Sequence, residues 1–118
     1  MFKKLILPIM FCMATAGFSQ ENYNMLVGTY TRGTVSKGIY SLTFSGKGKF
    51  ISQKLLAESD NPSYLAFSPD RKFVYAVNEH GEESTISAFA FDKANQTLTF
   101  INKVPAAGAD PCYITVSD

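Results

Sequence analysis

One segment of this 118-residue chain recurs further along it, and this recurrence constrains the fold more than any other feature. The stretch NPSYLAFS at residues 61–68 matches DPCYITVS at residues 110–117, 49 positions later. Three further pairs match with offsets of 47, 49 and 50: residues 39–44 with 86–91, Lys54-Leu55 with Lys103-Val104, and Val27-Gly28 with Val77-Asn78. Four separate places therefore give one repeat period near 49 residues.

Each repeat contains short apolar and β-branched runs that are separated by Gly, Pro, Asp and Asn, and no long segment shows helical periodicity. We expect strands at residues 25–31, 38–44, 50–57, 64–68, 73–78, 86–91, 98–104 and 113–116. The predicted fold class is therefore all-β. A period of about 40 to 50 residues with four strands in each unit is typical of the four-stranded antiparallel blades of a β-propeller. A β-sandwich also has short strands at even spacing and is the alternative.

The repeat also gives the domain organisation. We predict an incomplete blade at residues 23–58, a full blade at residues 61–107 and the start of a third blade at residues 111–118. Blade strands are apolar on both faces because each blade packs against two neighbours, and Phe73 to Val77 runs without polar alternation. Two blades leave faces and strand edges uncovered, so we expect residues 21–118 alone to be poorly folded and inactive.

The first twenty residues have the pattern of a secretory signal peptide. Lys3 and Lys4 precede an apolar run from Leu5 to Ala16, which is too short to span a bilayer. Small residues before Gln20 suit cleavage after Ser19 or Gln20. We therefore expect an exported protein, periplasmic or secreted, that is not attached to a membrane after cleavage.

Composition and charge narrow the classes of partner. The chain has eleven Lys and Arg against ten Asp and Glu, which does not indicate a nucleic-acid or membrane partner. After signal cleavage only Cys112 remains, so an internal disulfide is excluded. One His and scattered acidic residues do not form a recognisable metal site, and we expect no metal and no cofactor.

Five motifs in order resemble the lactonase family of seven-bladed β-propellers, to which the bacterial 6-phosphogluconolactonases of the propeller type belong. The motifs are residues 26–31 (LVGTYT), 38–40 (GIY), 61–70 (NPSYLAFSPD), 75–79 (YAVNE) and 108–112 (GADPC). Seven blades of this period would need roughly 340 residues. The resemblance implies a full-length hydrolase that opens a sugar lactone to its aldonic acid, with the site at the ring axis and with no oligomeric partner.

The resemblance also places several loop residues of this chain at the axial site. Lactone opening needs an activated water and donors to the developing oxyanion. We predict Glu79 and His80 as catalytic, with His80 as general base and Glu79 as its orienting partner. We predict Tyr30, Arg32, Asn61 and Asp110 as substrate-binding residues. A solvated loop histidine with charged neighbours is the simpler interpretation of His80.

Two alternatives stay open at this point. Relatives often carry a histidine directly after the Asp-Pro-Cys stretch, whereas this chain has Tyr113. The chain therefore also fits a non-catalytic propeller that binds a sugar, a peptide or a protein. Export would also separate the protein from phosphorylated gluconolactone, which is cytoplasmic, so an unphosphorylated lactone is the alternative substrate.

Overall fold

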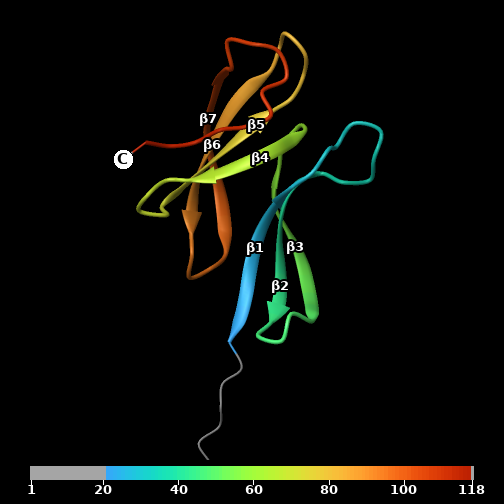
Figure 1. Cartoon of the computed structure of the whole chain (residues 1–118), viewed down its shortest axis with the longest axis vertical. Helices are drawn as coiled ribbons and strands as arrows, with labels where there is room; N and C mark the ends of the chain where they lie inside the picture. The colour runs from blue at the N-terminus through green and yellow to red at the C-terminus, as the bar shows by residue number, and fades with distance from the viewer. Residues whose placement is uncertain (1–20, 118) are drawn as a thin grey trace, which may run out of the picture.

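The computed structural model describes residues 21–117, and it contains only strands and their connections (Figure 1). The predicted signal peptide at residues 1–20 and the last residue, Asp118, lie outside the described residues. The strands are β1 (Asn22–Gly28), β2 (Gly38–Ser45), β3 (Phe50–Glu58), β4 (Pro62–Phe67), β5 (Phe73–Asn78), β6 (Thr85–Asp92) and β7 (Thr97–Pro105). The all-β prediction is confirmed.

The strands form two antiparallel sheets in simple sequential order. β1, β2 and β3 form a three-stranded sheet, and β4, β5, β6 and β7 form a four-stranded sheet. In both sheets each strand pairs with the next strand along the chain, as expected when short turns join antiparallel neighbours. β4 and β7 are therefore the two edges of the larger sheet.

Two strand predictions differ from the structure by more than two residues. β1 lies three residues earlier than expected, because beyond Gly28 the chain leaves β2 and the backbone N–H of Thr31 donates to the side chain of Asn61 instead. The strand expected at residues 113–116 is absent from the described part of the chain. A strand needs a hydrogen-bonded partner, and this segment pairs with neither sheet, although the rings of Tyr113 and Tyr64 of β4 lie with their centroids 5.0 Å apart. The start of a third blade there stays a prediction.

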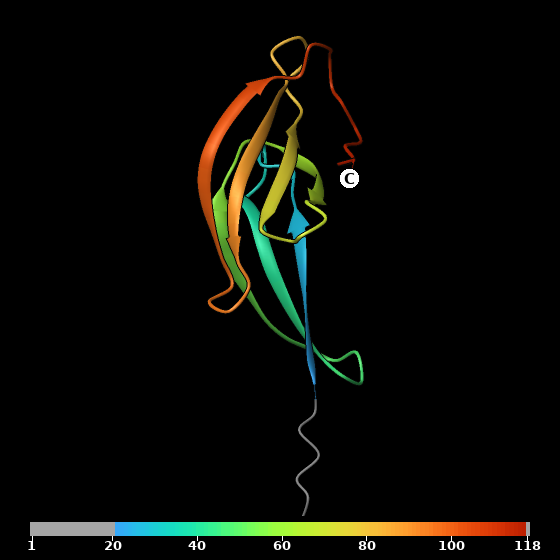
Figure 2. The same cartoon turned by 90° about the vertical axis from the view of Figure 1, so that its left-hand side faces the viewer.

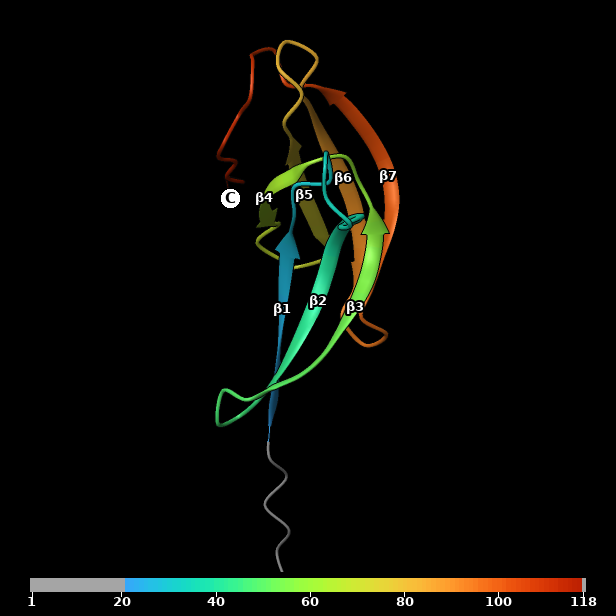
Figure 3. The same cartoon turned by 90° about the vertical axis from the view of Figure 1, so that its right-hand side faces the viewer.

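The hydrophobic core lies between the two sheets, which stack face to face (Figures 2 and 3). Ile39 of β2 is fully buried against Val74, Ala76 and Phe89 of the larger sheet. β1 contacts β4 at one end of this interface, and β3 contacts β7 at the other. Burial of apolar surface against a neighbouring sheet therefore stabilises both sheets.

The two sheets approach each other closely at Gly28, the last residue of β1. A Cβ atom at this position would lie only 1.8 Å from the carbonyl oxygen of Pro62, the first residue of β4. Only a residue without a side chain allows β1 and β4 to come so close. This contact sets the spacing between the two sheets beside the polar loops described below.

The faces of the sheets that point away from this interface expose large apolar side chains. Tyr23, Met25 and Phe50 of the first sheet are each more than half exposed. On the second sheet Val104 is also more than half exposed. Both outer sides of the stacked sheets therefore carry exposed apolar side chains, which are suited to packing against a further surface.

Candidate active site

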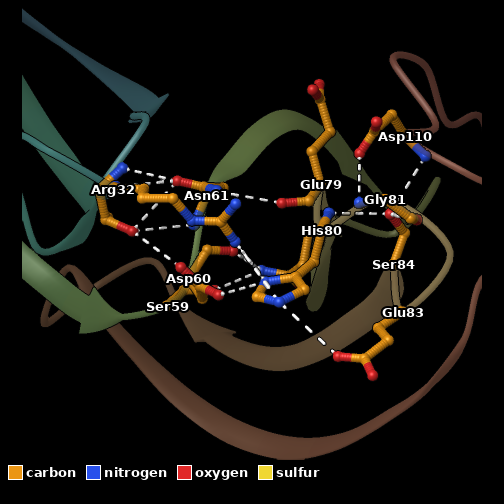
Figure 4. A network of polar contacts seen from close by, with 12 residues as sticks. Arg32, Ser59, Asp60, Asn61, Glu79, His80, Gly81, Glu83, Ser84 and Asp110 are labelled. Carbon is orange, nitrogen blue, oxygen red and sulfur yellow. Dashed lines mark hydrogen bonds and ion pairs between the residues drawn. The ribbon is translucent and has the colours of Figure 1, made fainter.

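A network of polar contacts joins the two sheets at one end of the molecule (Figure 4). It is built from three connections, the β1–β2 loop, the short β3–β4 link and the β5–β6 loop, together with Asp110 from the segment after β7. All six residues that the sequence predicts for the site belong to this network, namely Tyr30, Arg32, Asn61, Glu79, His80 and Asp110. The fold therefore brings them together, although they are separated by up to 80 positions in the sequence.

Glu79, which directly follows β5, is half-buried, and two hydroxyl groups hold its carboxylate. Tyr30 Oη donates to Glu79 Oε2 at 2.9 Å, and Ser63 Oγ donates to Oε1. Tyr30 belongs to the β1–β2 loop and Ser63 to β4. The carboxylate is therefore fixed from both sheets.

His80 faces a different environment from that of Glu79. Its Nδ1 lies 2.6 Å from Arg32 Nη2 and 3.2 Å from Asp60 Oδ2, and its Nε2 lies 3.7 Å from Glu83 Oε2. A ring without a proton on Nδ1 accepts a hydrogen bond from Arg32, whereas a ring with that proton donates to Asp60. The carboxylate partners of His80 are thus Asp60 and Glu83.

The expected pairing of Glu79 with His80 does not occur in this structure. The Glu79 carboxylate and the His80 ring point to opposite sides of the chain (Figure 4), because adjacent residues in extended backbone alternate in direction. His80 instead lines a cavity of about 780 Å³ between the sheets. Other residues that line this cavity are Lys37, Glu58, Asp60, Glu83, Phe100 and Lys103.

Asn61 and Asp110, the first residues of the two sequence copies, make equivalent contacts. Both adopt a left-handed backbone, with φ of 40° and 42°, directly before a proline. The side-chain oxygen of Asn61 accepts the backbone N–H groups of Thr31 and Arg32 at 2.9 and 3.1 Å. The side chain of Asp110 accepts the N–H of Gly81 at 2.7 Å. Each residue thus fastens the loop of the preceding sheet, and direct contact of either one with substrate stays a prediction.

Asn61 also provides the sharpest test of this fastening role. Replacement by alanine leaves the N–H groups of Thr31 and Arg32 and the carbonyl of Glu79 without their partner, and we expect a loss of roughly 2 to 4 kcal/mol in the free energy of unfolding. Asn61→Asp keeps the accepting oxygen, as in Asp110, so it should cost less than half as much. Urea unfolding measures the difference when both variants are made in the full-length protein, the product of the complete reading frame. Equal losses would contradict the fastening role.

The contact with Glu79 also changes the acidity of Tyr30. The hydrogen bond to the Glu79 carboxylate, followed by desolvation and by the charges of Glu79 and Asp110, raises the pKa of Tyr30 above its ordinary value of 10.0. Removing the charge in Glu79→Gln should therefore lower the Tyr30 pKa toward 10.0. Titration of the Tyr30 ring signal by NMR, assigned with Tyr30→Phe, measures the shift. An unchanged Tyr30 pKa in Glu79→Gln would show that the contact is absent in solution.

The six predicted site residues leave out four others of the network. Asp60, Glu83 and Ser84 contact His80, and Ser63 contacts Glu79. The alternation of side chains along extended backbone could have separated Glu79 from His80 in advance. No sequence signal assigns Asp60 to His80 or Ser63 to Glu79, because both contacts depend on how neighbouring connections pack.

Two features are absent from residues 21–117. They contain no group of three or more His, Cys, Asp or Glu side chains with an arrangement suited to a metal ion. They also contain no helix with the length and apolar character needed to cross a membrane.

The two stacked antiparallel sheets, of three and four strands, and the loops that meet at one end place this chain among the β-propellers. Comparison with known proteins defines the group within that class. The family model described as "Lactonase, 7-bladed beta-propeller" matches residues 24–118. The chain belongs to this lactonase family. The propeller prediction is thereby confirmed, and the β-sandwich is excluded.

Individual relatives agree with the family assignment. The 6-phosphogluconolactonase of Bacillus subtilis is 36% identical over 93 residues, which cover 78% of this chain and 26% of that protein. A Bacteroides uniformis structure assigned as a 6-phosphogluconolactonase has a TM-score of 0.73 and 43% identity to this chain. The match covers 82% of this chain and 28% of the Bacteroides uniformis chain. The periplasmic gluconolactonase PpgL of Pseudomonas aeruginosa has a TM-score of 0.71 and 35% identity, and the match covers 77% of this chain and 27% of PpgL. The chain thus spans about a quarter of the length of these relatives.

Proposed function

We propose that the full-length protein is an exported hydrolase that opens a sugar lactone to its aldonic acid. The observation that carries the proposal is the carboxylate of Glu79, which two hydroxyl groups hold beside β4 in a chain of the lactonase family. We place β4 at the propeller axis, as the innermost strand of its blade. Glu79 then lies at the mouth of the axial channel, where substrates of propellers bind.

In this mechanism Glu79 acts as a general base. It takes a proton from a water molecule, and the water oxygen attacks the lactone carbonyl carbon. The bond between that carbon and the ring oxygen then breaks, and the ring oxygen takes up the proton that Glu79 received. This gives the hydroxyl group of the acid and returns Glu79 to its carboxylate form. We propose that other blades supply the donors to the oxyanion, as such hydrolysis requires.

His80 has a different role in this proposal from the one expected of it. Its ring and the Glu79 carboxylate point to opposite sides of the chain, so the two groups do not face one water molecule. We propose that His80, Arg32 and Asp60 fix the β1–β2 loop against the β5–β6 loop. Arg32 then contributes to the site through the shape of its loop.

The assay that tests the function uses the full-length protein and two substrates. Gluconolactone and its 6-phosphate are each followed by the release of acid, with the spontaneous hydrolysis subtracted. We expect turnover of at least one of them, and the ratio of kcat/KM values identifies the preferred form. Turnover of neither would count against the enzyme and in favour of a propeller that only binds its ligand.

We also propose that further blades complete the ring around the two sheets. The exposed apolar side chains on both outer faces and the short span relative to the relatives support this. We expect residues 21–118 alone to aggregate or to unfold without cooperativity. A cooperative thermal transition of this piece as a soluble monomer would contradict the proposal.

Export is the third element of the proposed function. The signal-peptide pattern of residues 1–20 supports it, and the similar Pseudomonas aeruginosa structure is of a periplasmic protein. N-terminal sequencing of the protein from its native cells should begin near Gln20 or Glu21. A mature protein that retains Met1 to Ala16 would contradict export by cleavage.

A further inference from the structure

We propose that Tyr30 and Ser63 are positioning residues, which hold the Glu79 carboxylate in the one orientation that allows it to activate water. This inference rests on the proposed function of Glu79. It changes the expected role of Tyr30 from a substrate ligand to a support of the general base, and it assigns a role to Ser63, which the sequence did not single out.

The first step of the argument is the use of both carboxylate oxygens. Ser63 Oγ donates to Oε1 and Tyr30 Oη donates to Oε2, so neither oxygen can turn without breaking a hydrogen bond. An ionised carboxylate has about four lone-pair sites, so one donor on each oxygen leaves a free site on both. The arrangement therefore fixes the group and leaves it able to accept a proton.

The second step is the support of the Glu79 backbone. Its N–H donates to the carbonyl oxygen of Asn61 at 3.2 Å, and Asn61 Nδ2 donates to the Glu79 carbonyl oxygen at 3.0 Å. Asn61 is itself buried, with 5% of its surface exposed. Both ends of the Glu79 residue are thus held before any substrate arrives, so the reaction does not have to order this side chain.

The third step separates Tyr30 from a substrate ligand. A phenol has one hydrogen to donate, and Tyr30 already donates it to Glu79. The same contact raises the pKa of Tyr30, so the phenol stays protonated, and remains a donor, through neutral and mildly alkaline pH. Tyr30 is therefore suited to hold the base and not to act as one.

The experiment is a set of double-mutant cycles on lactone hydrolysis by the full-length protein. Tyr30→Phe and Ser63→Ala are each measured alone and in the Glu79→Gln background. We expect each single change to lower kcat by roughly tenfold, because small misplacement of a reacting group is costly, while KM stays within about twofold. In the Glu79→Gln background, neither change should lower the remaining kcat further. Ser63→Thr keeps the hydroxyl and should retain most of the kcat that Ser63→Ala loses.

Matched controls come from exposed residues of the first sheet, away from the network. Tyr23→Phe removes a phenol hydroxyl from β1, and Ser52→Ala removes a hydroxyl from β3, and both should leave kcat unchanged. The midpoint of thermal unfolding of every variant shows whether a loss of kcat comes from unfolding. A wild-type midpoint together with a lower kcat supports positioning.

Four results would overturn the inference. Unchanged kcat in Tyr30→Phe and Ser63→Ala would remove the positioning role while the lactonase function stands. A rise in KM alone would return Tyr30 to the role of a substrate ligand. A tenfold loss that persists in the Glu79→Gln background would show an action independent of Glu79. Absence of turnover in the unmodified protein would overturn the proposed function, and the positioning role with it.

Discussion

Replacement of Glu79 by glutamine in the full-length protein is expected to lower kcat for lactone hydrolysis by roughly 100- to 10,000-fold, the usual contribution of a general base. Glutamine has nearly the same shape, and its Oε1 accepts a hydrogen bond from one of the hydroxyl groups of Tyr30 and Ser63 while its Nε2 donates to the other, so the site keeps its structure. The amide cannot take a proton from water at neutral pH. Steady-state rates with the preferred lactone measure the effect, with KM expected to change little.

The control for Glu79 is a second acidic residue in the same connection. Glu82 is exposed in the β5–β6 loop, and the Glu82→Gln variant removes the same charge at a site outside the hydroxyl contacts. We expect kcat of Glu82→Gln to stay within about twofold of the unmodified protein, because exposed charges contribute little. Equal losses in the two variants would point to a general effect of charge and would remove Glu79 as the base.

Replacement of Gly28 by alanine is expected to destabilise the full-length protein by more than about 3 kcal/mol, because the added methyl group has no room. The new Cβ would lie 1.8 Å from the carbonyl oxygen of Pro62 and 3.0 Å from its carbonyl carbon. Both are backbone atoms, so no side chain can rotate away, and β1 must separate from β4. The total stability of a domain is about 5 to 15 kcal/mol, so this loss is a large part of it.

Gly108 provides the matched control for the change at Gly28. A Cβ at Gly108 would meet nothing within 4 Å, and this residue does not have a positive φ. We expect Gly108→Ala to change the urea midpoint very little, whereas Gly28→Ala should shift it strongly or prevent soluble expression. Unfolding of Gly28→Ala at the same midpoint as the unmodified protein would contradict the close packing of β1 on β4.

The positions of the strands were largely predictable from local sequence. Residues 73–78 form β5 as expected, and β2, β3, β6 and β7 differ from the predicted ranges by one residue at the ends. Turn residues and β-branched runs act over a few positions, so their effect can be read without knowledge of the fold. β1 was misplaced by three residues because a contact with Asn61, thirty positions away, takes Thr31 out of the sheet.

The candidate site was predictable as a group of loops and not as a set of contacts. The repeat places the loops around Arg32, Asn61 and Glu79 at the same end of successive blades, and the structure shows them in one network. The partners within the network differ from those expected. Glu79 contacts Tyr30 and Ser63, whereas His80 contacts residues of the inter-sheet cavity.

The sequence by itself determined the repeated unit, the all-β class and the equivalence of Asn61 with Asp110, because each of these follows from short patterns and their spacing. Only the tertiary structure decided which side chains form hydrogen bonds with one another in the candidate site. The contact of Tyr30 with Glu79 joins residues 49 positions apart, and it depends on how closely one sheet approaches the next. That approach is set by the packing at Gly28 and Pro62, where two backbones meet without an intervening side chain.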